Sequence, residues 1–564
     1  MERLLKQPQK NMTREHIAPD GHGVSGSSKN VINLSAPDTP YPQRFVPPPA
    51  ILNYAVNSLA SSYPKESAKH LLTRFQGAVG AAFLMLCALA AMLWPIAAFI
   101  TFNAITAFYF TLVIVFRFWL LLLGWREKIE GAPLHILHDE DLPVITILLP
   151  LYRDAAALPL LAQHVDKIDY PESKKDVKLL LEEDDWETIN EAIKLGLAQR
   201  YHLIVIPPCE PRTKPKACNV GLQLARGSLI VIYDAEDQPQ QDQLRKAAAA
   251  FHGRDKSLAC VQARLNYYNR DDNWLTRLFT LEYSLWFDWL LPALQKMSAP
   301  IPLGGTSNFF RTAILKTVGG WDPYNVTEDA DLGLRLARLG YRVEVIGSTT
   351  FEEANCKTRN WLRQRSRWLK GYMQTWLVHM RSPQKIIAAT GLRGFLAVQL
   401  FVAGNVFSAL INPVMWSVFV FWALWSPSAL HTLLPAPLMW LNLFALATGN
   451  FLFILTMAIG PLKRGWRELA PYALTAPAYW LLSSLAAYKA LWQAVFRPHY
   501  WEKTDHVISA AARERRDAAL AAHFSDEPTY DRRLLHTKEC DCDCRTALSE
   551  NERTWQCVHH PRSP

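Results

Sequence analysis

Apolar and polar segments alternate along the 564-residue chain on a scale that separates membrane-crossing sequence from water-soluble sequence. Residues 76–94 and 98–123 are each apolar and long enough to cross the roughly 30 Å hydrocarbon layer of a bilayer as a helix. Pro95 marks a short turn between them. The pattern predicts a transmembrane hairpin over residues 76–123 with both of its ends in the cytoplasm.

A second apolar block covers residues 394–495 and is less regular. Residues 433–459 form a clear span, whereas residues 394–425 are too long for one straight span and too short for two. Basic residues follow both 433–459 and 471–495, which conflicts with the tendency of Lys and Arg to stay on the cytoplasmic side. We therefore expect transmembrane helices over 394–495, with either 394–425 or 471–495 as a re-entrant or kinked element.

Residues 140–358, between the two apolar blocks, have the composition of a water-soluble domain, and their apolar segments are shorter. Residues 144–150 and 228–233 are apolar runs of strand length, and helical patterns lie between them. Strands that alternate with helices predict a mainly parallel α/β sheet. Ligands of such open sheets bind beyond the carboxyl ends of the strands. Residues 359–390 then predict amphipathic helices at the membrane surface.

Both ends of the chain are polar. Residues 1–70 are rich in proline, show little helical periodicity and contain no early apolar core of a signal peptide. We expect them to form a flexible cytoplasmic tail, and residues 507–564 a second polar tail. In that tail Cys540, Cys542 and Cys544 offer thiolates to zinc, although alternating Cys-x-Cys is not the usual spacing of a zinc finger.

The net charge of +9 admits two interpretations. It fits an anionic partner, and it equally fits the basic cytoplasmic loops of a protein in a lipid bilayer. The basic residues are dispersed along the chain rather than gathered into one arm or stripe, which excludes nucleic acid as an expected partner.

Three acidic clusters lie at predicted strand ends or helix starts, and they are Glu182–Asp185, Asp234–Asp237 and Thr327–Asp329. Carboxylates and phosphate oxygens are hard ligands that suit Mg²⁺ or Mn²⁺. Asp234, Glu236 and Asp237 follow a buried strand, where a metal ion would bridge the protein and a diphosphate. The competing interpretation is a solvated turn whose acids cap a helix.

Lys214 opens the helix that holds Asn219, and a lysine near a helix N-terminus attracts phosphate. Thr327 either caps the helix that follows it, or belongs with Glu328 and Asp329 to a catalytic triplet in which Asp329 is the general base. The helix over residues 359–380 mixes aromatic and basic residues, among them Gln364, Arg367 and Trp368. It fits both a helix lying on the membrane and a helix that contacts a sugar and a diphosphate.

This order of motifs resembles the membrane-integrated family 2 glycosyltransferases, such as bacterial cellulose synthase and hyaluronan synthase. Those enzymes carry an acid after the second strand, a D-x-D type cluster, a T-E-D triplet and a Q-x-x-R-W motif, flanked by membrane helices. The matching segments here are Glu183/Asp184, Asp234-Ala-Glu-Asp237, Thr327-Glu328-Asp329 and Gln364-x-x-Arg367-Trp368.

The resemblance implies a role for each motif. It assigns the nucleotide sugar to Glu183 or Asp184, Lys214, Asn219 and Asp234. It assigns Mg²⁺ or Mn²⁺ to Asp234, Glu236 and Asp237, with the choice between Glu236 and Asp237 open. It assigns catalysis to Thr327, Glu328 and Asp329, with Asp329 as the base. It assigns the acceptor and the diphosphate to Gln364, Arg367 and Trp368.

The implied fold is an α/β GT-A type (Rossmann-like) cytoplasmic catalytic domain with a multi-span α-helical transmembrane region, in a bacterial inner membrane. The implied reaction is inverting transfer from a nucleotide sugar, expected to be a UDP-sugar, to a growing polysaccharide with coupled translocation. Two alternatives stay open: addition of one sugar to a lipid or glycan acceptor, and a non-enzymatic membrane scaffold with a degenerate transferase domain.

Overall fold

The computed structural model describes residues 44–128, 137–425, 434–504 and 509–525. Within these ranges nine strands form one sheet in the order β1-β4-β3-β2-β5-β8-β7-β9-β6. The strands are β1 (Arg44–Phe45), β2 (Ile145–Leu151), β3 (Lys175–Glu182), β4 (His202–Ile206), β5 (Leu229–Ile232), β6 (Gln238–Pro239), β7 (Leu258–Tyr267), β8 (Asn308–Arg311) and β9 (Arg342–Glu352).

The half of the sheet from β1 to β5 is parallel, and β8 joins β5 and β7 by antiparallel pairing. The predicted α/β class of the catalytic domain, with a mainly parallel sheet, is therefore confirmed. The parallel half places the carboxyl ends of β2, β3 and β5 at one edge, where ligands of such sheets bind.

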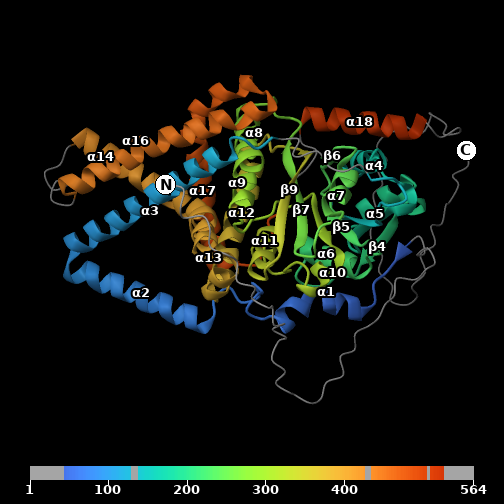
Figure 1. Cartoon of the computed structure of the whole chain (residues 1–564), viewed down its shortest axis with the longest axis horizontal. Helices are drawn as coiled ribbons and strands as arrows, with labels where there is room; N and C mark the ends of the chain where they lie inside the picture. The colour runs from blue at the N-terminus through green and yellow to red at the C-terminus, as the bar shows by residue number, and fades with distance from the viewer. Residues whose placement is uncertain (1–43, 129–136, 426–433, 505–508, 526–564) are drawn as a thin grey trace, which may run out of the picture.

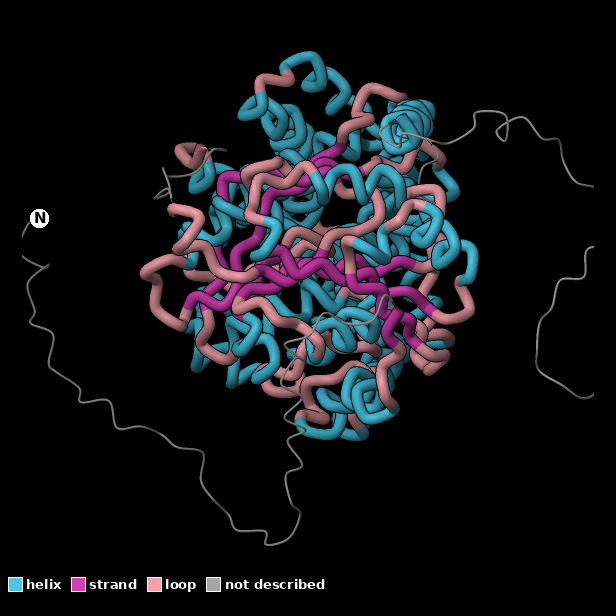
Figure 2. Tube along the Cα trace, turned by 90° about the vertical axis from the view of Figure 1, so that its right-hand side faces the viewer, coloured by secondary structure: helices cyan, strands magenta, loops and turns pink. Residues whose placement is uncertain are grey.

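Helices cover both faces of the sheet (Figure 2). The described helices are α1 (Pro49–Ser62), α2 (Arg74–Leu93), α3 (Pro95–Gly124), α4 (Leu158–Asp166), α5 (Trp186–Lys194), α6 (Lys214–Gln223), α7 (Gln243–Phe251), α8 (Trp274–Leu285), α9 (Leu291–Lys296), α10 (Thr312–Thr317), α11 (Glu328–Arg338), α12 (Thr358–His379), α13 (Pro383–Ala397), α14 (Gly404–Trp425), α16 (Ala436–Ile459), α17 (Ala476–Phe496) and α18 (Ala510–Ser525).

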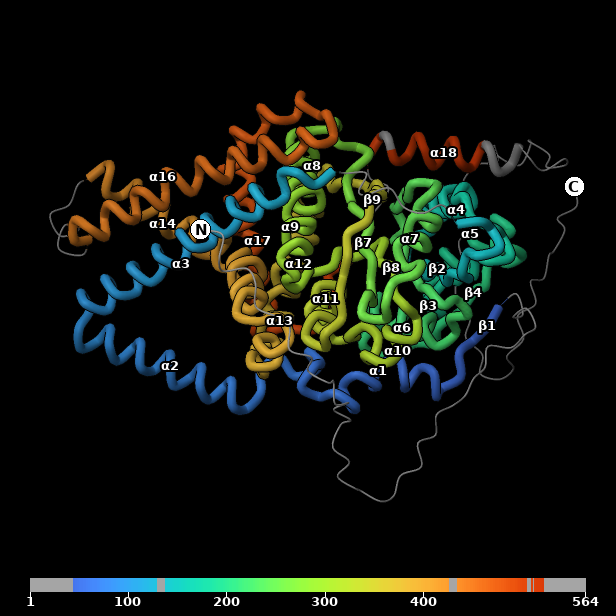
Figure 3. Tube along the Cα trace, in the orientation of Figure 1, coloured from blue at the N-terminus to red at the C-terminus, as the bar shows by residue number. Residues whose placement is uncertain are grey.

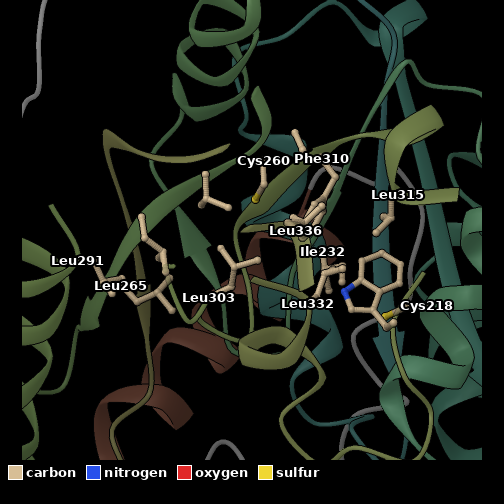
Figure 4. Close-up of a cluster of buried hydrophobic side chains, with 14 of the residues drawn as sticks. Cys218, Ile232, Cys260, Leu265, Leu291, Leu303, Phe310, Leu315, Leu332 and Leu336 are labelled. Carbon is tan, nitrogen blue, oxygen red and sulfur yellow. The ribbon is translucent and has the colours of Figure 1, made fainter. Parts of the chain in front are cut away.

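Alternate residues of the strands enter two separate cores. In β2, Ile147 and Leu149 pack into one core against α4, α5 and α7, whereas Leu148 packs into the other against α6. Successive strand side chains point to opposite faces, so a strand covered on both faces needs a continuous apolar run. Figure 4 shows part of the second core, where Ile232 of β5 lies near Leu332 and Leu336 of α11.

The structured part of the chain begins earlier than the sequence predicted. Residues 44–62, which the sequence predicts to belong to a flexible tail, form β1, paired with β4, and α1, packed on α6. In α1, Ile51, Ala55 and Leu59 recur every four residues on one buried face. The apolar stripe is short and follows several prolines, so the sequence pattern did not predict a helix. The stripe is buried only because it packs on the surface of α6. Residues 1–43 lie outside the described part.

Four described helical segments are long and apolar enough to cross a membrane, and they are Arg74–Leu93, Pro95–Gly124, Pro383–Trp425 and Ala436–Arg464. The predicted turn at Pro95 is confirmed, because Pro95 is the first residue of α3. These helices extend to one side of the sheet, while α8, α9, α12 and α17 stand between them and the strands (Figure 1).

The apolar segment 394–425, which is too long for one straight span, is divided into three helical parts. Residues 394–425 run through α13, the π-helical turn η4 (Val398–Ala403) and α14, which contains Pro413. Helix α17 is not among the described helices that meet the length and composition of a span. Its Ala486, Ala487 and Ala490 pack against Leu369 of α12 instead. Helix α17 thus packs on α12, and Val406, Ala409 and Leu410 of α14 pack against the same cluster.

The chain returns to the sheet after α17 (Figure 3). Part of the predicted polar tail forms α18, in which Arg515 donates to Gln238 of β6 at 2.7 Å and lies over the Tyr268 ring. The cysteines at 540, 542 and 544 lie outside the described residues.

Candidate active site

A cavity of about 420 Å³ gathers most of the predicted site residues from four separate segments of the chain. It lies beyond the carboxyl ends of β3 and β5 and is closed by α12 on the membrane side. The predicted residues that line it are Lys214, Asp234, Glu236, Thr327, Glu328, Asp329, Gln364, Arg367 and Trp368.

Lys214 holds one wall of this cavity. It is the first residue of α6, and its ammonium pairs with the Asp234 carboxylate and donates to the Gly305 carbonyl at 2.7 Å. Burial alone would lower the pKa of Lys214, but the carboxylates of Asp234 and Glu328 raise it above its usual range. The lysine is therefore a fixed positive charge, which suits a phosphate group.

Asp329 and Glu328 stand in the first turn of α11, next to Thr327 at its N-terminal boundary. The Asp329 carboxylate accepts the Ala330 N–H at 2.7 Å. Burial raises the pKa of Asp329, and burial together with the Asp329 charge raises the pKa of Glu328. An aspartate with a raised pKa is a stronger proton acceptor than an exposed one, so Asp329 can act as a general base.

Asp237 lies behind Asp234 and Glu236, with its side chain fully buried. One carboxylate oxygen accepts the Asp234 N–H at 2.7 Å and the Thr306 hydroxyl, and the other is buried without a hydrogen-bond partner. Burial and the charges of Asp234 and Glu236 raise the pKa of Asp237 far above its usual value. A divalent cation would relieve both the orphaned oxygen and the repulsion.

No group of three or more His, Cys, Asp or Glu side chains in the described ranges is arranged to hold a metal ion by itself. Asp234, Glu236 and Asp237 therefore do not form a complete three-carboxylate cage. This arrangement still fits Mg²⁺ or Mn²⁺, because such ions are commonly bound by one or two carboxylates together with substrate phosphates.

The first acidic cluster is placed differently from the prediction. Glu182, at the end of β3, lines the cavity and pairs with Lys216 at 2.9 Å, whereas Glu183 and Asp184 are exposed. Asp184 reaches the cavity only through its ion pair with Arg212, which lines it. Register along the strand decides this, because the last inward-facing position of β3 is residue 182.

Asn219 does not line the cavity. Its side-chain amide donates to the carbonyls of Ala55 and Trp321 at 2.9 and 2.8 Å, and its oxygen accepts the Trp321 N–H at 3.0 Å. The residue fixes α1 and the Trp321 loop onto α6. The structure therefore gives it a packing contact in place of the nucleotide contact implied by the resemblance.

The Q-x-x-R-W helix closes the cavity. Gln364 accepts the Asn355 side-chain N–H at 2.8 Å. The Arg367 guanidinium lies 4.6 Å over the Trp501 ring, and its Nε is buried without a hydrogen-bond partner. Burial lowers the pKa of Arg367, against the opposing charges of Glu328, Asp234 and Asp329. The unsatisfied donor faces a site rich in carboxylates and is suited to a diphosphate.

Several lining residues were missed by the sequence interpretation. Glu352, at the end of β9, adds a fourth carboxylate beside Asp234 and Glu236. Trp501, Lys503 and Thr504 line the cavity from the chain that follows α17. Two features of the sequence could have indicated these residues. One is the pair of acids that includes Glu352 at the end of a strand, and the other is the aromatic and basic run that includes Trp501 and Lys503 after an apolar helix.

Lys503 fastens this returning segment to the catalytic domain. Its ammonium donates to the Asp154 carboxylate at 3.0 Å and to the carbonyls of Tyr152 and Arg153. From the sequence, Lys503 is predicted only to be one of the basic residues that follow the apolar segment 471–495. The local sequence does not show that the chain folds back onto residues 152–154, some 350 positions earlier.

Residues 229–462 match the sequence model of the glycosyl transferase family group 2. Similar proteins include probable glycosyltransferase YdaM of Bacillus subtilis (strain 168), 24% identical over 256 residues, which are 44% of this chain and 57% of that protein. The beta-monoglucosyldiacylglycerol synthase of Nostoc sp. (strain PCC 7120 / SAG 25.82 / UTEX 2576) is 28% identical over 259 residues, 45% of this chain and 52% of that protein.

Probable glucomannan 4-beta-mannosyltransferase 10 of Arabidopsis thaliana is 25% identical over 245 residues, 42% of this chain and 44% of that protein. The chain spans about half the length of the curated relatives it matches. Among solved structures, the mannosyltransferase PcManGT from Pyrobaculum calidifontis in complex with GDP-Man and Mn²⁺ aligns with a TM-score of 0.45 and 20% identity, over 69% of this chain and 99% of that one.

The match over residues 229–462 and the similar proteins named above support the resemblance to family 2 glycosyltransferases that the order of the motifs predicted.

Proposed function

We propose that the protein is an inverting glycosyltransferase that moves a sugar from a UDP-sugar to a growing polysaccharide and passes the product through its own membrane helices. The observation that carries this proposal is the extent of the cavity. The same space that contains Lys214, Asp234 and Asp329 is also lined by Asn405 of α14, within a candidate membrane span.

The chemistry follows from the charged groups in the cavity. Asp329 accepts the proton of the attacking hydroxyl, and a single base on one side of the sugar corresponds to inversion. Lys214 and Arg367 neutralise the departing diphosphate. Mg²⁺ or Mn²⁺, held by Asp234 with Glu236 or Asp237, would supply further stabilisation of the leaving phosphate charge. The exposed end of the cavity near Glu182 and Arg212 accommodates the nucleoside.

A polar path into the membrane region supports translocation. Asn405, Ser408 and Asn412 are spaced by three and four residues, so they share one face of α14. The Ser408 hydroxyl and the Asn412 carbonyl oxygen are buried without hydrogen-bond partners. Polar groups within membrane helices are costly and commonly mark a substrate pathway.

A second candidate is the addition of one sugar to a lipid acceptor. Apolar side chains line the membrane side of the cavity, among them Phe287, Leu303 and Leu369. One similar protein is named as a synthase of a glucosylated diacylglycerol. We propose a bacterial inner membrane as the location for both candidates, with the catalytic domain in the cytoplasm.

The test uses full-length protein in lipid bilayers with labelled UDP-glucose and UDP-N-acetylglucosamine, with and without Mn²⁺ or Mg²⁺. High-mass product that resists lipid extraction supports the polymerase, and product limited to single-sugar lipids supports the second candidate. Asp329→Asn is the matched inactive control. If no donor releases UDP above the level of that variant, the enzymatic proposal fails.

A further inference from the structure

Gln262, in the middle of β7, has a fully buried side chain that bonds to the backbone of a neighbouring loop. That loop is residues 304–307, which we call the glycine loop. The Oε1 atom of Gln262 accepts the Gly304 N–H at 2.8 Å, and its Nε2 atom donates to the Thr306 carbonyl at 3.1 Å. One side chain therefore fixes the backbone on both sides of Gly305.

The pairing of the strands brings Gln262 to this loop. Strand β7 runs antiparallel to β8, and Gln262 stands opposite Asn308, the residue that follows the glycine loop. The register between β7 and β9 shifts just after Gln262, as it does at a β-bulge, and bulges commonly re-aim a side chain. The Gln262 amide also donates to the Ala263 carbonyl at 2.9 Å, so both of its hydrogens have acceptors and its orientation is fixed.

The two halves of the glycine loop are held by different parts of the sheet. The Thr306 hydroxyl donates to the Ile232 carbonyl of β5 at 3.0 Å, so the second half is tied to the strand that carries the acid cluster. In the first half, the Gly304 N–H bonds to Gln262 and the Gly304 carbonyl accepts from the Asn308 side chain. The half that contains both glycines therefore depends on β7 and β8.

Gly304 and Gly305 need this support, because glycine loses more conformational freedom on folding than any other residue. Gly305 also has no side chain through which it could pack. Its position matters for the site, since both glycines line the cavity. A Cβ atom on Gly305 would lie 3.4 Å from the Asp329 carboxylate and 4.0 Å from the Lys214 ammonium. The Gly305 backbone is thus the part of the cavity wall between the base and the lysine.

The Gly305 carbonyl connects this support to the charged groups of the site. It accepts from the Lys214 ammonium at 2.7 Å, and the same ammonium pairs with the Asp234 carboxylate. A lysine ammonium sits on a flexible four-carbon stem and has no preferred direction of its own. The Gly305 carbonyl and the Asp234 carboxylate together define where the positive charge lies. A displaced carbonyl would leave Lys214 with only one of these two acceptors.

We propose that Gln262 is a positioning residue for the departure of the diphosphate. It fixes the Gly305 carbonyl, and through that carbonyl it fixes the Lys214 ammonium, which neutralises the leaving group as negative charge develops on it. Gln262 is not among the described residues that line the cavity, so it acts through Lys214 and not on the substrate. This inference rests on the proposed function and adds to it a residue in the interior of the sheet.

The test is a double-mutant cycle on UDP release by full-length protein in bilayers. The variants are Gln262→Met, which keeps the length of the side chain and removes its hydrogen bonds, Lys214→Met, and the double variant. Gln262→Met should lower kcat by about 100-fold, because a misplacement on the order of 1 Å costs that much in rate. In the Lys214→Met background the same change should lower kcat by less than about twofold, since the group on which Gln262 acts is absent. A purely structural role would give the same loss in both backgrounds.

Thr146→Val is the matched control for stability. Thr146 is equally buried near the amino end of β2, away from the cavity, and its hydroxyl donates to Asp176 at 2.7 Å and accepts the Gly227 N–H at 2.8 Å. The variant should lower the melting temperature as Gln262→Met does and keep kcat within about twofold. Gln262→Glu is the conservative variant. Burial favours its protonated carboxyl, which can accept from Gly304 and still donate, so its loss of kcat should be smaller.

Each outcome decides between the claims. An unchanged kcat in a folded Gln262 variant, or an equal loss with and without Lys214, overturns the positioning role and leaves the transferase proposal standing. If Gln262→Met does not fold, Gln262→Glu enters the same cycle. If the Lys214 variants turn over too slowly, the cycle is measured on the dissociation constant of UDP, where loss of one phosphate contact corresponds to a rise of about tenfold. Absence of UDP release from any donor by the unmodified protein contradicts the proposed function itself.

Discussion

Replacing Gly305 by alanine probes the centre of the proposed reaction space without disturbing the fold. A Cβ atom at this position would lie 3.4 Å from the Asp329 carboxylate and 4.0 Å from both the Asp234 carboxylate and the Lys214 ammonium. These are ordinary van der Waals distances, and the Gly305 backbone does not adopt a left-handed conformation. The methyl group therefore fits, but it occupies the space between the base, the acid cluster and the lysine.

The size of the effect follows from this geometry. A methyl group displaces the reacting sugar by on the order of 1 Å, and a misplacement of that size costs about 100-fold in rate. We expect Gly305→Ala to lower kcat/KM for UDP release by about 100-fold while the melting temperature changes by less than about 2 °C, since no core contact is lost. Continuous UDP detection and differential scanning fluorimetry in detergent measure the two quantities.

Two glycine variants bracket the result. Gly80→Ala lies on α2 with no atom within 4 Å of the new Cβ and should behave as the unmodified protein. Gly333→Ala would place its Cβ 2.1 Å from the Ile301 carbonyl and should lower the melting temperature. If Gly305→Ala melts normally and keeps full activity, the sugar does not react between Asp329, Asp234 and Lys214, and the assignment of this space is refuted.

Four further predictions concern the charged groups. Asp329→Asn should lower kcat by about 10²–10⁴-fold, as expected for loss of a general base. Because burial raises the pKa of Asp329 and the base must be ionised, activity should fall as the pH is lowered through a value above the usual aspartate pKa of about 3.9; an acid limb at or below that value in a pH–rate profile would contradict the burial argument. EDTA should abolish UDP release, and added Mn²⁺ or Mg²⁺ should restore it; full activity in EDTA would exclude the metal. In Asp237→Asn added metal should not restore UDP release, because the substitution removes the carboxylate oxygen of Asp237 that is buried without a hydrogen-bond partner. Lys503→Met should raise the donor KM by about tenfold, because the contacts of Lys503 to residues 152–154 are lost. The control is Lys385→Met, since Lys385 is mostly exposed. An unchanged donor KM in Lys503→Met would show that the returning segment does not hold the donor.

Much of the architecture was visible in local pattern. The apolar lengths on either side of Pro95 predicted α2 and α3, because crossing hydrocarbon requires every backbone group to bond within its own helix. Continuous apolar runs predicted the doubly covered strands β2 and β5. The apolar run that ends at Asp234 predicted that this acid lies at the ligand-binding edge of the sheet, because the ends of parallel strands share one edge. The place of Asp329 beside it was implied only by the resemblance.

Position within a motif was harder to predict. Four consecutive acids follow β3, and the cavity is lined by Glu182 while its neighbours Glu183 and Asp184 are exposed. Pleating turns successive side chains to opposite faces, so a one-residue difference in where the strand ends changes which acid points inward. Asn219 stands at the spacing expected for a site residue, yet its hydrogen bonds go to Ala55 and Trp321.

The sequence by itself determined the class of fold, the membrane-length helices and the chemical groups of the site, since these depend on local periodicity and residue type. Only the tertiary structure decided that Trp501 and Lys503 return to the cavity, that α1 packs on α6, and that Glu282, Trp286 and Asn405 line the same cavity as Asp329. The physical reason is that periodicity identifies the face a segment must bury, whereas the neighbour that covers this face comes from a distant part of the chain.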